Sequence, residues 1–291
     1  MISLLLLGLL WGSNFLFMKL AVARIPAVDV VWLRTLFGAL PILALALIRN
    51  GVRRDDWRSI HHFAAMAVLA NVGPYLFFVL GTEHLPSGVT GVISGAIPSI
   101  TAAIVAVTLP EERLTRGKLV GLALGFAGVI MVAPLDMLSA GFTGSSLLGV
   151  AATLAGCVSY ALALVYARRF VQPLGMGPVK LAAYQMVLAC LFLMPFASPS
   201  SFWVLAEDRT ALLGLVFGLG LAGTGLAFVI YYYLVGRMGA LRAASVYYIP
   251  PAVALALGAT LLDEPFGGLQ IAGAGLIMAG IYYANRQSVR A

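Results

Sequence analysis

Charged side chains are scarce in this chain. Only 10% of its 291 residues are Asp, Glu, Lys or Arg, whereas a soluble domain carries roughly a quarter. The sequence therefore lacks the polar side chains that would cover the surface of a water-soluble globule. A hydrophobic share of 62% and a mean hydropathy of +1.00 instead indicate an integral membrane protein.

Further absences exclude whole classes of function. No GxxxxGK[ST] string is present, so ATP-driven transport by this chain alone is not expected. Ser, His and Asp residues do not converge at one membrane depth, which argues against a catalytic triad and against an enzyme. The His61-His62 pair is a poor metal site, and Cys157 and Cys190 are predicted to be packing residues in apolar segments. No metal and no cofactor are expected.

Apolar stretches of about 20 residues, the length that an α-helix needs to cross a bilayer, recur along the whole chain. The first begins at residue 2 and has no basic region before it, so we read it as a membrane span and not as a signal peptide. We predict ten transmembrane helices, at residues 2–20, 28–48, 60–82, 87–108, 116–134, 146–167, 178–197, 210–235, 240–261 and 267–285.

The net charge of +7 is distributed unevenly over the predicted loops. With a cytoplasmic N-terminus, the inner loops hold nearly all Lys and Arg residues, and the outer loops hold only Arg24 and Arg209. Because basic residues are retained on the cytoplasmic side, we predict that both termini are cytoplasmic, in a bacterial inner membrane. The basic excess is thus explained by topology and by anionic lipids, without nucleic acid.

The chain also repeats itself without a gap after a shift of 152 residues. Five spans in each half would make the two halves enter the membrane in opposite directions, which is typical of secondary transporters. We therefore predict an all-α, 5+5 inverted-topology repeat around a central cavity, with repeats at 1–135 and 146–286 and a short cytoplasmic tail at 287–291. The matching positions include Ile97-Pro98 with Ile249-Pro250, Glu112 with Glu264, Gly121 with Gly273, and Gly128 with Gly280.

Several motifs resemble those of EamA-type members of the drug/metabolite transporter superfamily, over essentially the whole chain. They are Leu10-Trp11-Gly12-Ser13-Asn14-Phe15 with Lys19, Arg34 in the second span, Pro98 followed by Glu111-Glu112, and Pro250 followed by Asp263-Glu264-Pro265. The resemblance implies a helical basket whose cavity is lined mainly by spans 1, 3, 4, 6, 8 and 9, with spans 5 and 10 at the periphery. It also implies export of amino acids or related metabolites by a monomer, although Gly-rich faces of spans 5 and 10 could serve a dimer.

Two basic residues within spans are candidates for binding a substrate carboxylate. Arg34 can pair with a carboxylate through two parallel hydrogen bonds. Alternatively, it pairs with helix-end carbonyls or an outer-loop acid. Lys19 near the outer end of the first span either snorkels to the headgroups or meets an anionic group at the mouth of the cavity.

Polar and aromatic residues at helical spacing form the predicted substrate site. Trp11, Asn14 and Met18 share one helix face, and Tyr75 and Phe78 lie on a stripe with Asn71 and Thr82. Such a stripe can be either a packing surface or a ligand site. Aromatic walls with polar tips favour neutral or aromatic amino acids. The substrate-binding candidates are Trp11, Asn14, Tyr75, Phe78, Ser94, Pro98, Tyr160, Tyr231 and Tyr248.

Three prolines are predicted to bend the helices that surround the site. Pro98 and the Pro250-Pro251 pair lie at equivalent points of the two halves, and bent helices at such points indicate a transporter's binding site. A static kink is the alternative. No Asp or Glu lies in the middle of a span, which favours facilitated or weakly coupled efflux.

Together these features predict a secondary carrier that exports small metabolites, above all amino acids, by alternating access. Efflux of drugs or other cationic compounds is the alternative within the same class, and a channel is a further one. A membrane enzyme or sensor without transport is the alternative from a different class.

Overall fold

The computed structural model describes residues 2–49, 54–108, 116–132, 144–238, 246–247, 249–264 and 267–286. Within these residues the regular secondary structure is entirely helical, as predicted. Predictions that concern Glu111, Glu112, Tyr248, Pro265 and the tail 287–291 lie outside this range.

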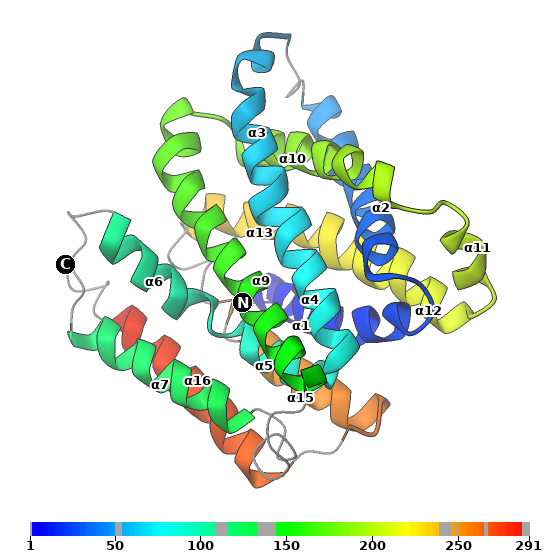
Figure 1. The fold of residues 1–291 in the computed structure, drawn as a ribbon. Helices are drawn as coiled ribbons and strands as arrows, with labels where there is room; N and C mark the ends of the chain where they lie inside the picture. The colour runs from blue at the N-terminus through cyan, green and yellow to red at the C-terminus, as the bar shows by residue number, and fades with distance from the viewer. Residues whose placement is uncertain are drawn as a thin grey trace.

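The helices of the first half follow the predicted spans closely (Figure 1). The third span is one long helical run whose hydrogen bonding changes to a π-helix, η2, and back. The elements are α1 (Ile2–Val22), α2 (Ala27–Ile48), η1 (Arg54–Ser59), α3 (Ile60–Met66), η2 (Ala67–Val72), α4 (Gly73–His84), α5 (Ser87–Ser94), α6 (Ile97–Thr108) and α7 (Arg116–Val132).

The second half also contains a π-helix, η6, inside one of its long helical runs. The elements are α9 (Gly144–Tyr166), η3 (Ala167–Val171), η4 (Gln172–Leu174), α10 (Pro178–Leu193), η5 (Met194–Phe196), α11 (Ser201–Ala206), α12 (Arg209–Leu213), η6 (Gly214–Leu226), α13 (Ala227–Met238), α15 (Pro250–Leu261) and α16 (Gly268–Arg286).

Seven helical runs in the described part of the chain are long and apolar enough to cross a membrane. Two shorter apolar helices, Ile249–Leu261 and Gly268–Gly280, and the 17-residue α7 fall on the remaining predicted spans. The protein is therefore a multi-helix membrane protein, and the count of ten crossings stays a prediction. The seven runs are Ile2–Val22, Ala27–Ile48, Asp56–His84, Ser87–Val105, Gly144–Leu174, Val179–Phe196 and Arg209–Tyr231.

The three prolines lie in the first turns of α6 and α15, directly after interruptions of the α-helix. Pro98 is the second residue of α6, which is separated from α5 by Gly95 and Ala96, and Pro250 and Pro251 are the first two residues of α15. A proline suits the first turn because the N–H that it lacks would have no partner there. Before α15, the carbonyl oxygen of Val246 accepts from the backbone N–H of Ile249 at 3.0 Å.

Helices α7 and α16 pack against each other along their lengths, and their other main contacts are with α5 and α6 (Figure 1). Glycines allow their backbones to meet: a Cβ on Gly128 would lie 2.6 Å from the carbonyl oxygen of Gly273, and one on Gly280 would lie 2.6 Å from that of Gly121. The order of these two contacts shows that α7 and α16 run antiparallel. The hydrophobic effect contributes little to helix association in lipid, and close packing of the two backbones stabilises the pair instead.

The turn between α4 and α5 is held by two charged side chains from other helices. The ammonium of Lys19 on α1 donates to the carbonyl oxygens of Thr82 at 2.7 Å and Leu85 at 3.0 Å. The Glu264 carboxylate, which follows α15, accepts from the amides of Ser87 at 2.6 Å and Gly88 at 3.0 Å. A cation at a helix C-terminus and an anion at an N-terminus satisfy backbone groups left unpaired at helix ends.

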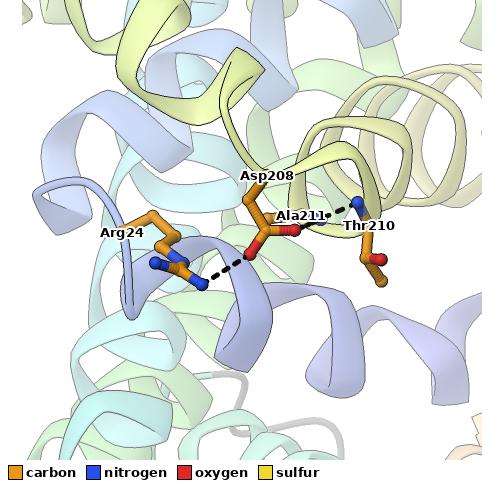
Figure 2. A network of polar contacts seen from close by, with 4 residues as sticks. All are labelled: Arg24, Asp208, Thr210 and Ala211. Atoms are coloured by element: carbon orange, nitrogen blue, oxygen red, sulfur yellow. Dashed lines mark hydrogen bonds and ion pairs between the residues drawn. The ribbon is translucent and has the colours of Figure 1, made fainter.

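A third polar contact joins the α1–α2 turn to the start of α12 (Figure 2). Arg24 pairs with the Asp208 carboxylate at 2.8 Å. The other oxygen of Asp208 accepts from the amides of Thr210 and Ala211, both at 3.1 Å, and so caps the helix. The amide of Ala211 is the main group that holds the pKa of Asp208 below its ordinary value, and Arg24 acts in the same direction.

Replacement of Gly280 by Ala tests the contact between α7 and α16. The new methyl group would meet backbone atoms of Gly121 and Gly125 that cannot move aside, so we expect a loss of about 1–3 kcal/mol in the free energy of unfolding in detergent. Gly275→Ala is the matched control on the same helix, because nothing lies within 4 Å of its Cβ position. Equal stability of the two variants would contradict a close backbone contact.

The lowered pKa of Asp208 predicts a dependence of stability on pH. A carboxyl group with a lower pKa in the folded state stabilises the fold above its unfolded pKa, and this contribution disappears as the pH falls through the folded pKa. The Asp208→Asn variant should therefore melt below the native protein at pH 7, and the two melting temperatures should converge in acid. A difference that grows as the pH falls would contradict the assignment.

Candidate functional site

A cavity of about 80 Å³ lies where elements of both halves meet. It has room for several water molecules, hence for a small solute. All six spans implied by the family resemblance contribute residues to its lining, and α2 adds Arg34. The lining residues are Trp11, Asn14, Phe15, Met18, Arg34, Tyr75, Phe78, Ser94, Ile97, Tyr160, Phe228, Tyr247 and Pro250.

Most residues predicted for the site come together in this cavity, namely Trp11, Asn14, Arg34, Tyr75, Phe78, Ser94, Tyr160 and Pro250. Pro98, Pro251, Tyr231 and Lys19 do not line it. Of these, Tyr231 packs behind the wall against Trp11, with ring centroids 5.6 Å apart. Lys19 is the C-terminal cap of α4 described above, a role that neither of its two predicted readings included.

The list of predicted site residues omitted five lining residues: Phe15, Met18, Ile97, Phe228 and Tyr247. Phe228 and Tyr247 belong to aromatic clusters in the sequence, but the sequence does not show which rings of these clusters face the cavity. Tyr247 precedes Pro250, and the chain there is not a continuous α-helix. Helical spacing therefore gives no rule for deciding which of two adjacent tyrosines faces inward.

Arg34 is the most constrained polar residue of the site. Its side chain is only 1% exposed, and its Nε donates to the Thr224 hydroxyl oxygen at 3.1 Å. The guanidinium carbon lies 3.7 Å above the centre of the Tyr75 ring, in a cation–π contact that strengthens where water is excluded. Its Nη1 is buried and has no hydrogen-bond partner among the described residues.

The π-helix η6 supplies the anchor for Arg34. The hydroxyl of Thr224 donates to the carbonyl oxygen of Leu219, five residues earlier, at 2.8 Å, so its lone pairs can face Arg34. Helix α2 approaches this point closely through Gly38, whose Cβ position lies 2.6 Å from Cγ2 of Thr224. Irregular helical turns of this kind are frequent at functional sites.

Asn14 reaches the same stretch of η6 from α1. Its side-chain amide donates to the carbonyl oxygen of Gly223 at 3.4 Å, a long contact. A Cβ on Gly223 would lie 1.9 Å from Oδ1 of Asn14, so the amide oxygen rests against the glycine. The polar end of Asn14 therefore serves contact between helices, which was one of its two predicted readings.

Aromatic rings form much of the cavity wall. Trp11 stacks on Tyr247, with centroids 5.2 Å apart, and meets Phe228 edge-on at 6.4 Å. Phe15 and Phe78 form a second edge-on pair at 5.9 Å. Offset and edge-on ring pairs of this kind hold one another in place, so the wall is preorganised for an apolar side chain.

Chemically, the cavity offers one guanidinium, several hydroxyl groups and aromatic faces. Neither Asp nor Glu occurs among its lining residues. The described part of the chain also holds no group of three His, Cys, Asp or Glu residues suited to a metal ion. The arrangement can bind a small solute with an acceptor group and an apolar part.

Comparison with known proteins identifies the family of this chain. The EamA-like transporter family matches residues 1–133 and 147–286. The chain belongs to this family. As a member of this family it is a membrane transport protein. The match omits only a short stretch between the two segments and the last residues of the chain.

Several relatives extend over nearly the whole chain. An uncharacterized transporter of Archaeoglobus fulgidus is 27% identical over 95% of this EamA protein and 95% of its own length. A probable amino-acid metabolite efflux pump of Salmonella typhimurium is 28% identical over 96% and 92%. An uncharacterized inner membrane transporter of Escherichia coli, YedA, is 28% identical over 96% and 88%.

A solved crystal structure has the same fold. It superposes with a TM-score of 0.64 over 99% of this EamA chain and 97% of its own, at 21% sequence identity. At this identity the likeness concerns the fold alone.

Thr224→Val tests the support of Arg34. The substitution keeps the shape but removes the acceptor of Nε, so we expect a loss of about 1–3 kcal/mol in the free energy of unfolding because a buried donor is left unpaired. Thr260→Val is the control: Thr260 makes a similar hydroxyl bond to its own helix, at 2.7 Å, but is exposed. Chemical unfolding in detergent measures both, and an equal effect would contradict a supporting role for Thr224.

Proposed function

We propose that this EamA protein is a secondary transporter that exports small metabolites, above all amino acids with neutral or aromatic side chains, by alternating access. The observation that carries the proposal is the cavity lined jointly by α1, α2, α4, α5, α6, α9, α13 and α15. A site built at the junction of two halves can open to either side when the halves move relative to each other.

The glycine contacts between α7 and α16 support the proposed inverted repeat. Gly121 and Gly273 are equivalent in the repeat, and so are Gly128 and Gly280. In the structure Gly128 meets Gly273 and Gly280 meets Gly121. Reciprocal contacts of this kind are what a two-fold axis between equivalent helices produces, and the antiparallel direction of the pair fits inverted insertion.

The two π-helices support the same arrangement. A shift of 152 residues moves η2, at Ala67–Val72, onto residues 219–224 inside η6. Both segments interrupt long helical runs at corresponding points of the halves. Interrupted helices at matching positions favour a binding site between the halves.

The proposal includes a bacterial inner-membrane location with both termini in the cytoplasm. The bias of Lys and Arg toward one set of loops supports this orientation, and one relative is named an inner membrane transporter. Both halves that meet at the cavity belong to one chain, and we propose that the monomer, surrounded by lipid, is sufficient for transport.

The substrate class rests on the lining residues and on one relative. The aromatic wall suits an apolar side chain, and a relative that is 28% identical is called a probable amino-acid metabolite efflux pump. Efflux of cationic drugs is the weaker alternative, because the lining holds a guanidinium and neither Asp nor Glu. A sensor or enzyme without transport is disfavoured by the family, whose members are named transporters.

Counterflow in proteoliposomes tests the proposal. Vesicles loaded with unlabelled leucine, phenylalanine or alanine should accumulate the labelled amino acid transiently and saturably, and empty vesicles should not. Linear, non-saturable entry would indicate a channel. Exchange of lipophilic cations alone would support the drug-efflux alternative and overturn the proposal.

Truncation of Trp11 should abolish most of this flux. Trp11→Ala removes the ring that contacts Tyr247 and Phe228, so we expect a fall of at least about tenfold, as for other central aromatic anchors. Trp203→Ala is the matched control, since Trp203 is 72% exposed on α11 and away from the cavity. Similar flux in the two variants, at equal amounts of reconstituted protein, would refute the cavity as the transport site.

A further inference from the structure

The cavity carries an unbalanced charge. Arg34 is the one cationic side chain among its lining residues, and the described lining contains neither Asp nor Glu. Two acids near the ends of the spans are engaged elsewhere. Asp29 accepts from the amide of Ser198 at 2.7 Å and from the hydroxyl of Ser201 at 2.5 Å, and Glu264 caps α5.

The guanidinium is also incompletely paired. Its Nε is bonded to Thr224 and its face is covered by Tyr75, while Nη1 is buried without a partner in the described structure. An unpaired charged donor in a low-dielectric interior is costly. A carboxylate matches the planar fork of a guanidinium and would both neutralise the charge and satisfy the free donor.

The cavity offers an ammonium group neutral acceptors but no opposite charge. Oδ1 of Asn14 has no hydrogen-bond partner among the described residues, and the oxygen of Ser94, whose hydroxyl donates to the carbonyl oxygen of Gly91 at 2.6 Å, can still accept. Trp11 contacts both Phe228 and Tyr247 in the part of the wall that suits an apolar side chain. Within the described lining, an α-ammonium therefore meets no opposite charge.

We propose that the cavity recognises its solute by a free carboxylate at Arg34 and does not require an α-ammonium group. The substrate class is then small monocarboxylates with an apolar side chain, including 2-oxo and 2-hydroxy acids as well as amino acids. The inference rests on the proposed transport function and narrows it. Lys19 is not the anchor, because its ammonium is bound to two backbone carbonyls and lies outside the cavity lining.

Ligand-induced thermal stabilisation of the full-length protein in detergent tests the inference without relying on transport. The probes are three side chains (methyl, isobutyl and benzyl), each as the amino acid, the 2-oxo acid and the amino-acid amide. At least one side chain should raise the melting temperature as its amino acid and as its 2-oxo acid, with apparent affinities within a few-fold of each other. The matching amide should bind about tenfold more weakly or not at all, because it lacks the charge-assisted pairing with Arg34.

Variants of Arg34 assign this preference to one side chain. Arg34→Gln should bring the acid and the amide to equal affinity, and Arg34→Lys should restore part of the preference, because it keeps the charge but loses the fork. Arg24→Gln is the control: it removes one positive charge at the surface, where Arg24 pairs with Asp208, and should leave the preference unchanged. The melting curve of each variant also reports whether it is folded.

The possible outcomes separate the inference from the proposed function. Equal stabilisation by acid and amide, stabilisation by none of the acids, or a preference that survives in Arg34→Gln would overturn the carboxylate anchor. Counterflow of amides as fast as acids would overturn it while leaving transport intact. Acid-selective binding without any counterflow would support the anchor and remove the proposed function.

Discussion

A guanidinium buried among membrane helices has to find its partners inside the protein, and the position of Arg34 shows how much of the structure this requires. Thr224 accepts its Nε, and the Tyr75 ring covers its face. These partners come from η6 and α4, so one side chain on α2 ties together three segments that are far apart in the sequence. The cavity lies beside this junction.

Close approach of helices makes such a junction possible. Gly38 lets α2 reach η6, and Gly91 on α5 lies so near α15 that its Cβ would be 2.2 Å from that of Ala254. In lipid, where apolar side chains gain little by leaving the solvent, contact between backbones and satisfied polar groups provides the stability. Lys19 and Glu264 show the polar part of this rule, because each completes the hydrogen bonds of a helix end on a neighbouring element.

Helical spacing in the sequence predicted many of the residues that line the cavity. Trp11, Asn14 and Met18 were assigned to one face of the first helix, and all three line the cavity, as do Tyr75 and Phe78 of the third span. Helical spacing does not predict the orientation of side chains where the backbone departs from a regular α-helix. Tyr247 lies before the first turn of α15 and could not be assigned a face. Pro98, the second residue of α6, is not among the residues that line the cavity, whereas its neighbour Ile97 is.

By itself the sequence determined the class of protein, the helical segments, the scarcity of buried acids and the resemblance to the EamA family. These depend on composition and on local spacing, which a one-dimensional pattern contains. Only the tertiary structure decided the partners of each polar side chain. Lys19 could have faced headgroups or solute, and it instead binds the end of α4. Asn14 could have bonded solute or a neighbouring helix, and it lines the cavity while its amide donates to the carbonyl oxygen of Gly223. Helical spacing assigns a residue to a face, but which backbone carbonyl or hydroxyl group lies opposite depends on how separate helices pack.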